Sequence, residues 1–417
     1  MTTSALHTLQ DRWVSSWNRC RSGPARAPVA ARSLAHIARQ IPGLLSGRKR
    51  LLVDISQLYK SEFRAGVQRV TRSILTEWLS HRPAGWSPQP VIFKEDGVWA
   101  CDDHMVRRTC PTIRRRFQPT DANIAPGNRI IFLDLNTELP GHRDWLLAAK
   151  AHGAHLTFVV YDLLPVQSPH WFPDVVGPLF AQWIRMVAEL GDDIACISNT
   201  VREDFLQWFE KEFGDRPPPR VRHFPLGADP FPACESLLPA AVTDAMGSRP
   251  TALMVSTVEP RKGHAQALDA LELLWESGIE LNLLIAGAEG WKIAPLAGSM
   301  RDHPEFGRRL FWLERCSDGQ IATCYRDSGV LLAPSFGEGF GLSLVEASRC
   351  GRSVIARDLP VFREVAPPGT TLFSGRASGR LADAIRSWLQ TRPGPVPPAS
   401  LCGWGDSARA LFELRSL

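Results

Sequence analysis

Two successive series of short apolar runs, each alternating with stretches of helical periodicity, constrain the fold of this chain most strongly. In the first half, β-branched or leucine-rich runs predict strands at Leu51–Ile55, Pro90–Phe93, Arg129–Leu133, Leu156–Tyr161, Ile194–Ser198 and Val221–Phe224. Helical stretches separate them, among them Val67–Leu79 and Val201–Phe213. Such alternation is typical of α/β proteins with parallel sheets.

The second half repeats the pattern. Its predicted strands are Ala252–Ser256, Leu281–Ala286, Leu310–Leu313, Val330–Pro334 and Ser353–Ala356, with helices near 262–277, 318–327 and 340–350. The 417 residues exceed what one core usually serves. We therefore predict two doubly wound, Rossmann-like domains with the active site in the cleft between them. The predicted limits are a basic extension over 1–49, a first domain over 50–228, a linker over 229–250 and a second domain over 251–398. A C-terminal helix over 399–417 is expected to return to the first domain.

Cysteine usage and hydropathy point to the cytoplasm. The nine cysteines are scattered and never spaced C-x-x-C, which argues against a disulfide framework and a zinc site. No apolar run approaches the roughly 20 residues that span a bilayer, and the N-terminus lacks the apolar region of a secretory signal.

Positive charge is concentrated at the N-terminus. Residues 1–50 hold nine lysines and arginines against Asp11, a net +8, whereas the whole chain is +5. Trp13 and Trp17 lie among these arginines, so the segment is either a peripheral anchor on an anionic membrane surface or a solvated extension. A one-sided basic tail does not indicate nucleic-acid binding.

The stretch Val330–Gly351, VLLAPSFGEGFGLSLVEASRCG, combines a buried strand, a glycine-rich turn and a helix start near Phe340. Free N–H groups at such a turn and helix N-terminus form a site for a diphosphate. The glycines Gly337, Gly339 and Gly341 let a ligand approach the backbone closely. A dinucleotide fingerprint would need glycine where Leu342 stands, and the chain lacks the G-K-[ST] of a P-loop.

Two carboxylates belong to this stretch, Glu338 in the turn and Glu346 on the helix. Glu338 is placed beside the diphosphate, where sugar hydroxyls can bind. Glu346 lies about two helical turns further on, where a carboxylate can hold both hydroxyls of a ribose.

The segment Ser256–Gly263, STVEPRKG, places Arg261 and Lys262 at the carboxyl end of the first strand of the second domain. Adjacent cations at a strand end suit a leaving diphosphate, because they stabilise its developing negative charge.

These motifs resemble the retaining glycosyltransferases of family 4, which have the GT-B fold. The family's E-x7-E motif corresponds to Glu338 and Glu346, and the resemblance covers roughly residues 50–415. It implies that Glu338 contacts the donor sugar, that Glu346 binds the ribose and that Lys262 binds the diphosphate. The backbone of Gly339, Phe340, Gly341 and Leu342 would complete the donor site.

The sequence departs from the family at three points. Ser256 stands where many members have an arginine, which leaves Arg261 as the second cation. The glycine-rich loop of the first domain retains only Gly66, which would close over the donor. Tyr161 stands where many relatives have a histidine, so Asp162 would orient the acceptor or the donor sugar.

Other positively charged residues allow two interpretations. Arg69, one turn into the helix after Gly66, is either a phosphate or acceptor contact or an exposed residue. An arginine cluster could receive an anionic acceptor or form a solvated face; it comprises Arg107, Arg108, Arg114, Arg115 and Arg116.

The EPRKG form of the cationic segment looks most like bacterial mannosyl- and rhamnosyltransferases of polysaccharide assembly, which implies GDP-mannose as donor and a glycan or lipid-linked glycan as acceptor. No D-x-D pair is present to hold a divalent ion, so we expect neither a metal nor another cofactor. Two alternatives remain: a GT-B epimerase or phosphorylase, and a non-catalytic nucleotide-sugar-binding scaffold.

Overall fold

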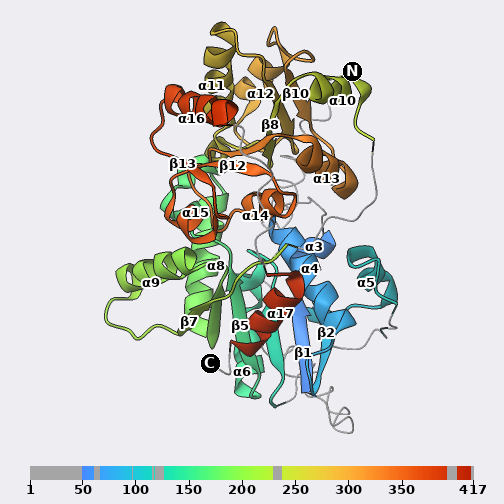
Figure 1. Ribbon diagram of the computed structural model, residues 1–417. Coiled ribbons are helices and arrows are strands. Elements are labelled where there is room, and N and C mark those ends of the chain that lie inside the picture. Colours follow the sequence, from blue (N-terminus) through green and yellow to red (C-terminus); the bar gives the residue numbers. More distant parts are fainter. Residues whose placement is uncertain are drawn as a thin grey trace.

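The computed structural model describes residues 49–60, 66–95, 97–114, 117, 126–228, 237–391 and 402–414. Two sheets, each flanked by helices, lie one above the other along the molecule (Figure 1). This arrangement confirms the predicted α/β fold with two Rossmann-like domains. The basic segment before Lys49 lies outside the described residues.

The first sheet has the order β3-β2-β1-β4-β5-β6-β7. All its neighbouring strands are parallel except β2 and β3, which form an antiparallel pair at one edge. The strands are β1 (Lys49–Asp54), β2 (Trp86–Lys94), β3 (Gly97–Ala100), β4 (Arg129–Phe132), β5 (His155–Val160), β6 (Asp193–Cys196) and β7 (Arg220–His223).

The second sheet is parallel throughout, with the order β10-β9-β8-β11-β12-β13. Its strands are β8 (Thr251–Val255), β9 (Asn282–Ala286), β10 (Leu310–Leu313), β11 (Val330–Ala333), β12 (Ser353–Arg357) and β13 (Thr371–Phe373). Counted within the domain, this is the 3-2-1-4-5-6 order of doubly wound folds, in which ligands bind where the order reverses. That switch point lies between β8 and β11.

Helices cover the sheets. In the first domain they are α3 (Ser56–Lys60), α4 (Gly66–Ser80), α5 (Asp103–Thr109), α6 (Arg143–Ala151), α7 (Leu164–Gln167), α8 (Val176–Leu190) and α9 (Asn199–Phe213), with short 3₁₀ turns at Leu139–His142 and Pro169–Trp171. Because both faces of a parallel sheet are covered, its strands are apolar along their length. Every residue of β4, β6, β9 and β11 is accordingly buried.

The remaining helices are α10 (Ala240–Ser248), α11 (His264–Glu276), α12 (Ala294–Arg301), α13 (Asp318–Asp327), α14 (Leu342–Arg349), α15 (Pro360–Val365), α16 (Ser378–Thr391) and α17 (Trp404–Glu413), with a 3₁₀ turn at Pro260–Lys262. Of all the helices in the described ranges, none combines the length and the apolar character that a bilayer crossing needs.

Helix α10 falls within the range 229–250 that was predicted as a linker. Its residues Val242 and Ala245 are buried and pack with Leu253 of β8 in the core of the second domain. The proline- and alanine-rich composition hid this helix, whose buried face is only two residues wide.

Helix α17 returns to the first domain and packs against α4 (Figure 1). Trp404, Ala408 and Leu411 join the core cluster of that domain. The indole N–H of Trp78 donates to the Ala408 carbonyl at 3.1 Å. Helix α17 is therefore part of the first domain's core.

Truncating Leu411 to alanine should destabilise the protein by about 2–5 kcal/mol, because this fully buried side chain would leave a cavity. Urea unfolding followed by tryptophan fluorescence measures the change. The control is Arg409→Ala, an exposed position on the same helix, which should change stability by less than about 0.5 kcal/mol. Equal effects of the two substitutions would mean that α17 does not pack as described.

Candidate active site

The candidate site lies at the switch point of the second sheet. Strands β8 and β11 are neighbours there, so the segments that follow them, 256–263 and 334–341, meet at one edge. Gly263 has a φ of 74°, and a Cβ at this position would overlap the carbonyl group of Pro334. The amide of Phe336 donates to the Arg261 carbonyl at 2.7 Å. The two predicted motifs are therefore packed directly on each other.

Glu338 is held by three side chains in this contact. Lys262 Nζ lies 2.6 Å from Glu338 Oε1 and Arg261 Nη1 lies 2.9 Å from Oε2. The Ser335 hydroxyl donates to Oε1 at 2.8 Å. The predicted residues Arg261, Lys262 and Glu338 thus form one ion cluster.

The charges of this cluster hold one another in the ionised state. Burial raises the pKa of Glu338, but Lys262 and Arg261 together outweigh it and bring the pKa to about 2. Burial lowers the pKa of Arg261, and Glu338 and Glu259 more than reverse that effect, so the guanidinium stays charged. An anionic ligand that displaced the carboxylate would find two charged donors in place.

Asp162 reaches this cluster from the first domain. It follows β5, and its Oδ1 accepts from the amide of Leu164 at 3.1 Å. Burial raises the pKa of Asp162, while Arg261 and Lys262 lower it and Glu338 raises it. Asp162 belongs to the first domain, but all three charges of the ion cluster influence its pKa.

The glycine-rich turn packs tightly on the first domain. A Cβ on Gly339 would overlap the carbonyl oxygen of Tyr161, and one on Gly337 would lie 2.8 Å from the Trp171 ring. Ser198, which caps α9, donates to the Gly339 carbonyl at 2.8 Å. Gly337 and Gly339 therefore allow close approach of protein backbone and side chains, and the approach of a ligand stays a prediction.

The helix after this turn begins at Leu342, not near Phe340. The capping residue Gly341 has a φ of 108°, and a Cβ there would lie 2.6 Å from the Phe362 ring. Phe340 is buried and its side chain belongs to the core cluster of the first domain. Packing within the protein therefore constrains the conformations of residues 340 and 341, whether or not a ligand binds there.

Glu346 lies in the second turn of α14 and is only 4% exposed. Its Oε2 accepts from the Tyr325 hydroxyl at 2.9 Å, and its Oε1 lies 2.8 Å from Arg69 Nη1 of α4. Burial raises the pKa of Glu346, and Arg69 opposes that shift. Gly66, at the start of α4, lies opposite Leu342, whose Cδ1 would be 3.8 Å from a Cβ at 66. Arg69 therefore contacts Glu346, a pairing that the sequence did not predict.

Several residues of the site were not predicted from the sequence. Ser335 binds Glu338, and Glu259 accepts from Arg261 Nε at 3.0 Å. Arg357, at the end of β12, donates to the carbonyls of Pro334 and Ser335 and lies 4.2 Å from the Phe336 ring centre. Only their location could have indicated them, because each is a polar residue at or shortly after the end of a predicted strand.

Other predicted residues lie elsewhere. Arg107 and Arg108 are exposed in the last turn of α5, and Arg108 lies 5.6 Å from the centre of the Tyr59 ring. Arg115 and Arg116 fall outside the described residues. Among the residues that the structure describes, no cluster of three or more His, Cys, Asp or Glu side chains is arranged to hold a metal.

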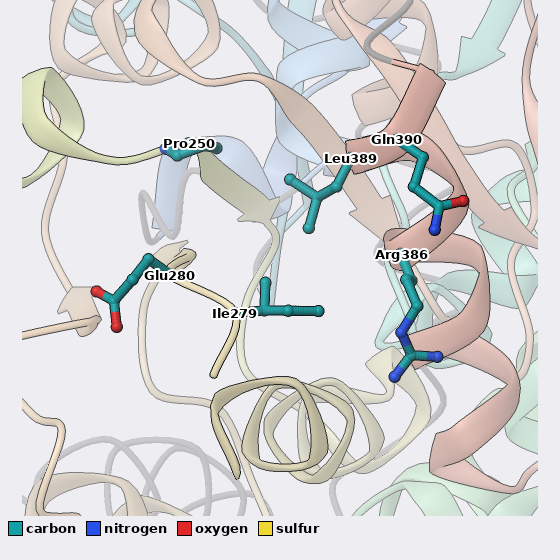
Figure 2. Close-up of a pocket in the computed structure, with 6 residues that line it drawn as sticks. All are labelled: Pro250, Ile279, Glu280, Arg386, Leu389 and Gln390. Atoms are coloured by element: carbon teal, nitrogen blue, oxygen red, sulfur yellow. The ribbon is translucent and has the colours of Figure 1, made fainter. Parts of the chain in front are cut away.

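A separate hollow of about 480 Å³ lies at the opposite end of the second sheet, before β8 and β9 (Figure 2). It is lined by Pro250, Ile279, Glu280, Arg386, Leu389 and Gln390. It shares no residue with the ion cluster, and the residues singled out by the sequence lie away from it.

Two facing Rossmann-like domains with a charged site at the switch point define a GT-B type of protein. Residues 241–396 match the family described as Glycosyl transferases group 1. Over 377 residues, 88% of this chain, the sequence is 36% identical to the serotype-specific mannosyltransferase WbdA of Escherichia coli. A shorter segment, 32% of the chain, is 36% identical to part of the phosphatidyl-myo-inositol mannosyltransferase of Mycobacterium leprae, 35% of that protein.

Residues 241–396 therefore carry a group 1 glycosyltransferase domain, in agreement with the resemblance. The chain spans about half the length of the WbdA proteins that it matches, 45% in the first of them.

Solved structures agree on the fold. Anabaena Alr3699/HepE in complex with UDP-glucose superposes with a TM-score of 0.58 at 14% identity, covering 88% of this chain and 95% of that one. Sucrose-phosphate synthase from Thermosynechococcus elongatus gives 0.57 at 16% identity, over 89% and 95% of the two chains. At these identities the likeness shows the GT-B fold alone.

The ion cluster should make stability depend on acid. Because the folded-state pKa of Glu338 is about 2, below its ordinary 4.5, its contribution is complete above about pH 4.5 and is lost as the pH falls toward 2. Between pH 5 and pH 3 the wild type should lose about 2 kcal/mol more of its free energy of unfolding than Glu338→Gln. Urea titrations at both pH values measure this difference, and parallel losses in the two proteins would contradict the assignment.

Proposed function

We propose that this chain is a retaining, metal-independent glycosyltransferase that moves mannose from GDP-mannose to a glycan or lipid-linked glycan in bacterial polysaccharide assembly. The observation that carries the proposal is the contact of Arg261 and Lys262 with Glu338 at the switch point of the second sheet. The names of the relatives, two kinds of mannosyltransferase, support the choice of sugar.

The carboxylate of Glu338 occupies the position that suits a diphosphate. On donor binding, the diphosphate oxygens would take over Lys262 and Arg261, and Glu338 would turn to the hydroxyls of the sugar. Lys262 and Arg261 would thus be paired with an anion both in the free protein and in the donor complex. In each state this pairing offsets the free-energy cost of burying the two cations. The amides of residues 339–342, where the turn leads into α14, would add donors to the phosphate, and Glu346 would accept from the ribose.

The reaction breaks the bond between the sugar C1 and the phosphate oxygen and forms a bond from C1 to the acceptor oxygen on the same face. The acceptor hydroxyl gives its proton to the departing phosphate, and Lys262 and Arg261 stabilise the negative charge that remains there. Asp162, which faces this cluster from the first domain, would orient the acceptor hydroxyl or the donor sugar.

The acceptor chemistry suggests where the enzyme works. A lipid-linked glycan would be presented at the inner face of the cell membrane. We place the protein in the cytoplasm, held peripherally there by the basic residues of 1–49, whose charge suits anionic lipids.

GDP-mannose should stabilise the fold, since a ligand that binds only the native state adds about 2.7 kcal/mol at a concentration of 100 times its Kd. A thermal-shift series with GDP-mannose, UDP-glucose and a dTDP-sugar measures the preference. The largest rise in Tm is expected with GDP-mannose. A shift with the UDP or dTDP compound and none with GDP-mannose would show that the donor is different.

Mannosyl transfer to a lipid-linked glycan should proceed unchanged in EDTA and give a product with the donor's anomeric configuration by NMR. Glu338→Gln should lower kcat by at least about 100-fold, as loss of a group that acts on the transition state does. Its Kd for GDP should stay within a few fold.

The matched control is Glu276→Gln, an exposed position on α11 of the same domain. It should transfer at the wild-type rate. Full activity of Glu338→Gln would remove Glu338 from the active site, and donor turnover without any acceptor would favour an epimerase or a phosphorylase.

A further inference from the structure

Glu346 receives its two donors from different domains. Tyr325 belongs to α13 of the second domain and is fully buried, and its hydroxyl lies 2.9 Å from Oε2. Arg69 belongs to α4 of the first domain, and its Nη1 lies 2.8 Å from Oε1. Each oxygen of the carboxylate therefore has one donor and retains acceptor capacity for a second.

The starts of two helices bring Arg69 and Glu346 together. Arg69 follows Gly66 by one helical turn, and Gly66 lies opposite Leu342 at the start of α14. Glu346 lies one turn beyond Leu342 on the same helix. The N-terminal turns of α4 and α14 are thus close to each other, and the ion pair between Arg69 and Glu346 joins them.

The charge of Glu346 also depends on this contact. Burial raises the pKa of the carboxyl group, Arg69 is the largest opposing influence, and Asp318 of α13 adds to the rise. The other titratable groups against it are Tyr325 and Cys350, whose own pKa values are raised by burial, so both are neutral at pH 7. Arg69 is the cation among these groups that favours an ionised carboxylate.

We propose that Arg69 is a positioning residue that fixes the orientation and the negative charge of Glu346, so that the second domain recognises a ribose fully only when the first domain is docked on it. The inference rests on the proposed function, in which Glu346 accepts from the ribose hydroxyls. It adds that a residue outside the nucleotide-binding domain sets the affinity for the nucleoside.

The test compares the binding of GDP and 2′,3′-dideoxy-GDP by calorimetry, using the full chain. Wild type should bind GDP at least about tenfold tighter, because hydrogen bonds to a charged acceptor are lost in the dideoxy compound. In Arg69→Met this ratio should fall below about threefold, and Arg69→Lys should retain part of it. Adding Arg69→Met to Glu346→Gln should lower the ratio no further, because both changes act through one carboxylate.

The matched control is Arg72→Met, on the same helix, where Arg72 Nε donates to the Thr109 carbonyl instead. It should keep the wild-type ratio. The Tm of each variant checks that it is folded, and the ratio of two Kd values for one protein is insensitive to the fraction that is active.

A pH series separates positioning from simple loss of structure. Without Arg69 the pKa of Glu346 rises further, so the ribose preference of Arg69→Met should be weakest at low pH and recover as the pH increases. In wild type, where Arg69 opposes the rise in the pKa of Glu346, the preference should weaken less than in Arg69→Met as the pH falls.

Failure of the inference and failure of the proposed function look different. If Arg69→Met keeps the wild-type ratio at every pH, Arg69 does not act through Glu346, while the proposed transfer reaction stands. If wild type does not distinguish the two compounds, the role of Glu346 is wrong and the inference falls with it. If wild type binds no nucleoside diphosphate at all, both proposals are overturned.

Discussion

The pairing of one buried carboxylate with two buried cations is the interaction on which the rest of the site depends. The side chains of Glu338, Arg261 and Lys262 are each less than a fifth exposed. Burying any one of these charges without its partners would cost a large desolvation free energy. Their meeting requires the strand order of the second sheet. This order makes β8 and β11 neighbours, although 74 residues, 256–329, lie between the end of β8 and the start of β11. The fold therefore creates the charged site by bringing two distant strand ends together.

The same turn joins the domains. Gly339 lies against the Tyr161 carbonyl, and the Ser198 hydroxyl at the N-terminus of α9 donates to the Gly339 carbonyl. Phe340 belongs to the core of the first domain. A second contact caps a helix across the boundary: Glu364 of α15 accepts from the amides of Asn199 and Thr200 at 2.6 and 2.9 Å. A carboxylate at a helix N-terminus is favoured by the free N–H groups and the helix dipole. Domain arrangement and site geometry are thus coupled through the segment that would hold the donor.

The strands and the positions of the two charged motifs were predictable because their signals are local. Apolar runs locate buried strands, and the motifs follow strands in a predicted parallel sheet. The direct pairing of Glu338 with Arg261 and Lys262 was not predicted. The contacts between the domains were not predictable, since nothing near Arg69 or Ser198 in the sequence indicates which distant residue it contacts. Helix α10 was missed for a related reason, because its burial comes from tertiary packing of Val242 and Ala245 and not from a wide apolar stripe.

The most direct test of the central claim is a crystal structure of the protein with bound GDP-mannose. We expect the diphosphate oxygens to lie within hydrogen-bond distance of Lys262 and Arg261, and Glu338 to have left these cations for the mannose hydroxyls. A donor bound elsewhere, with Glu338 still fixed between the two cations, would contradict it.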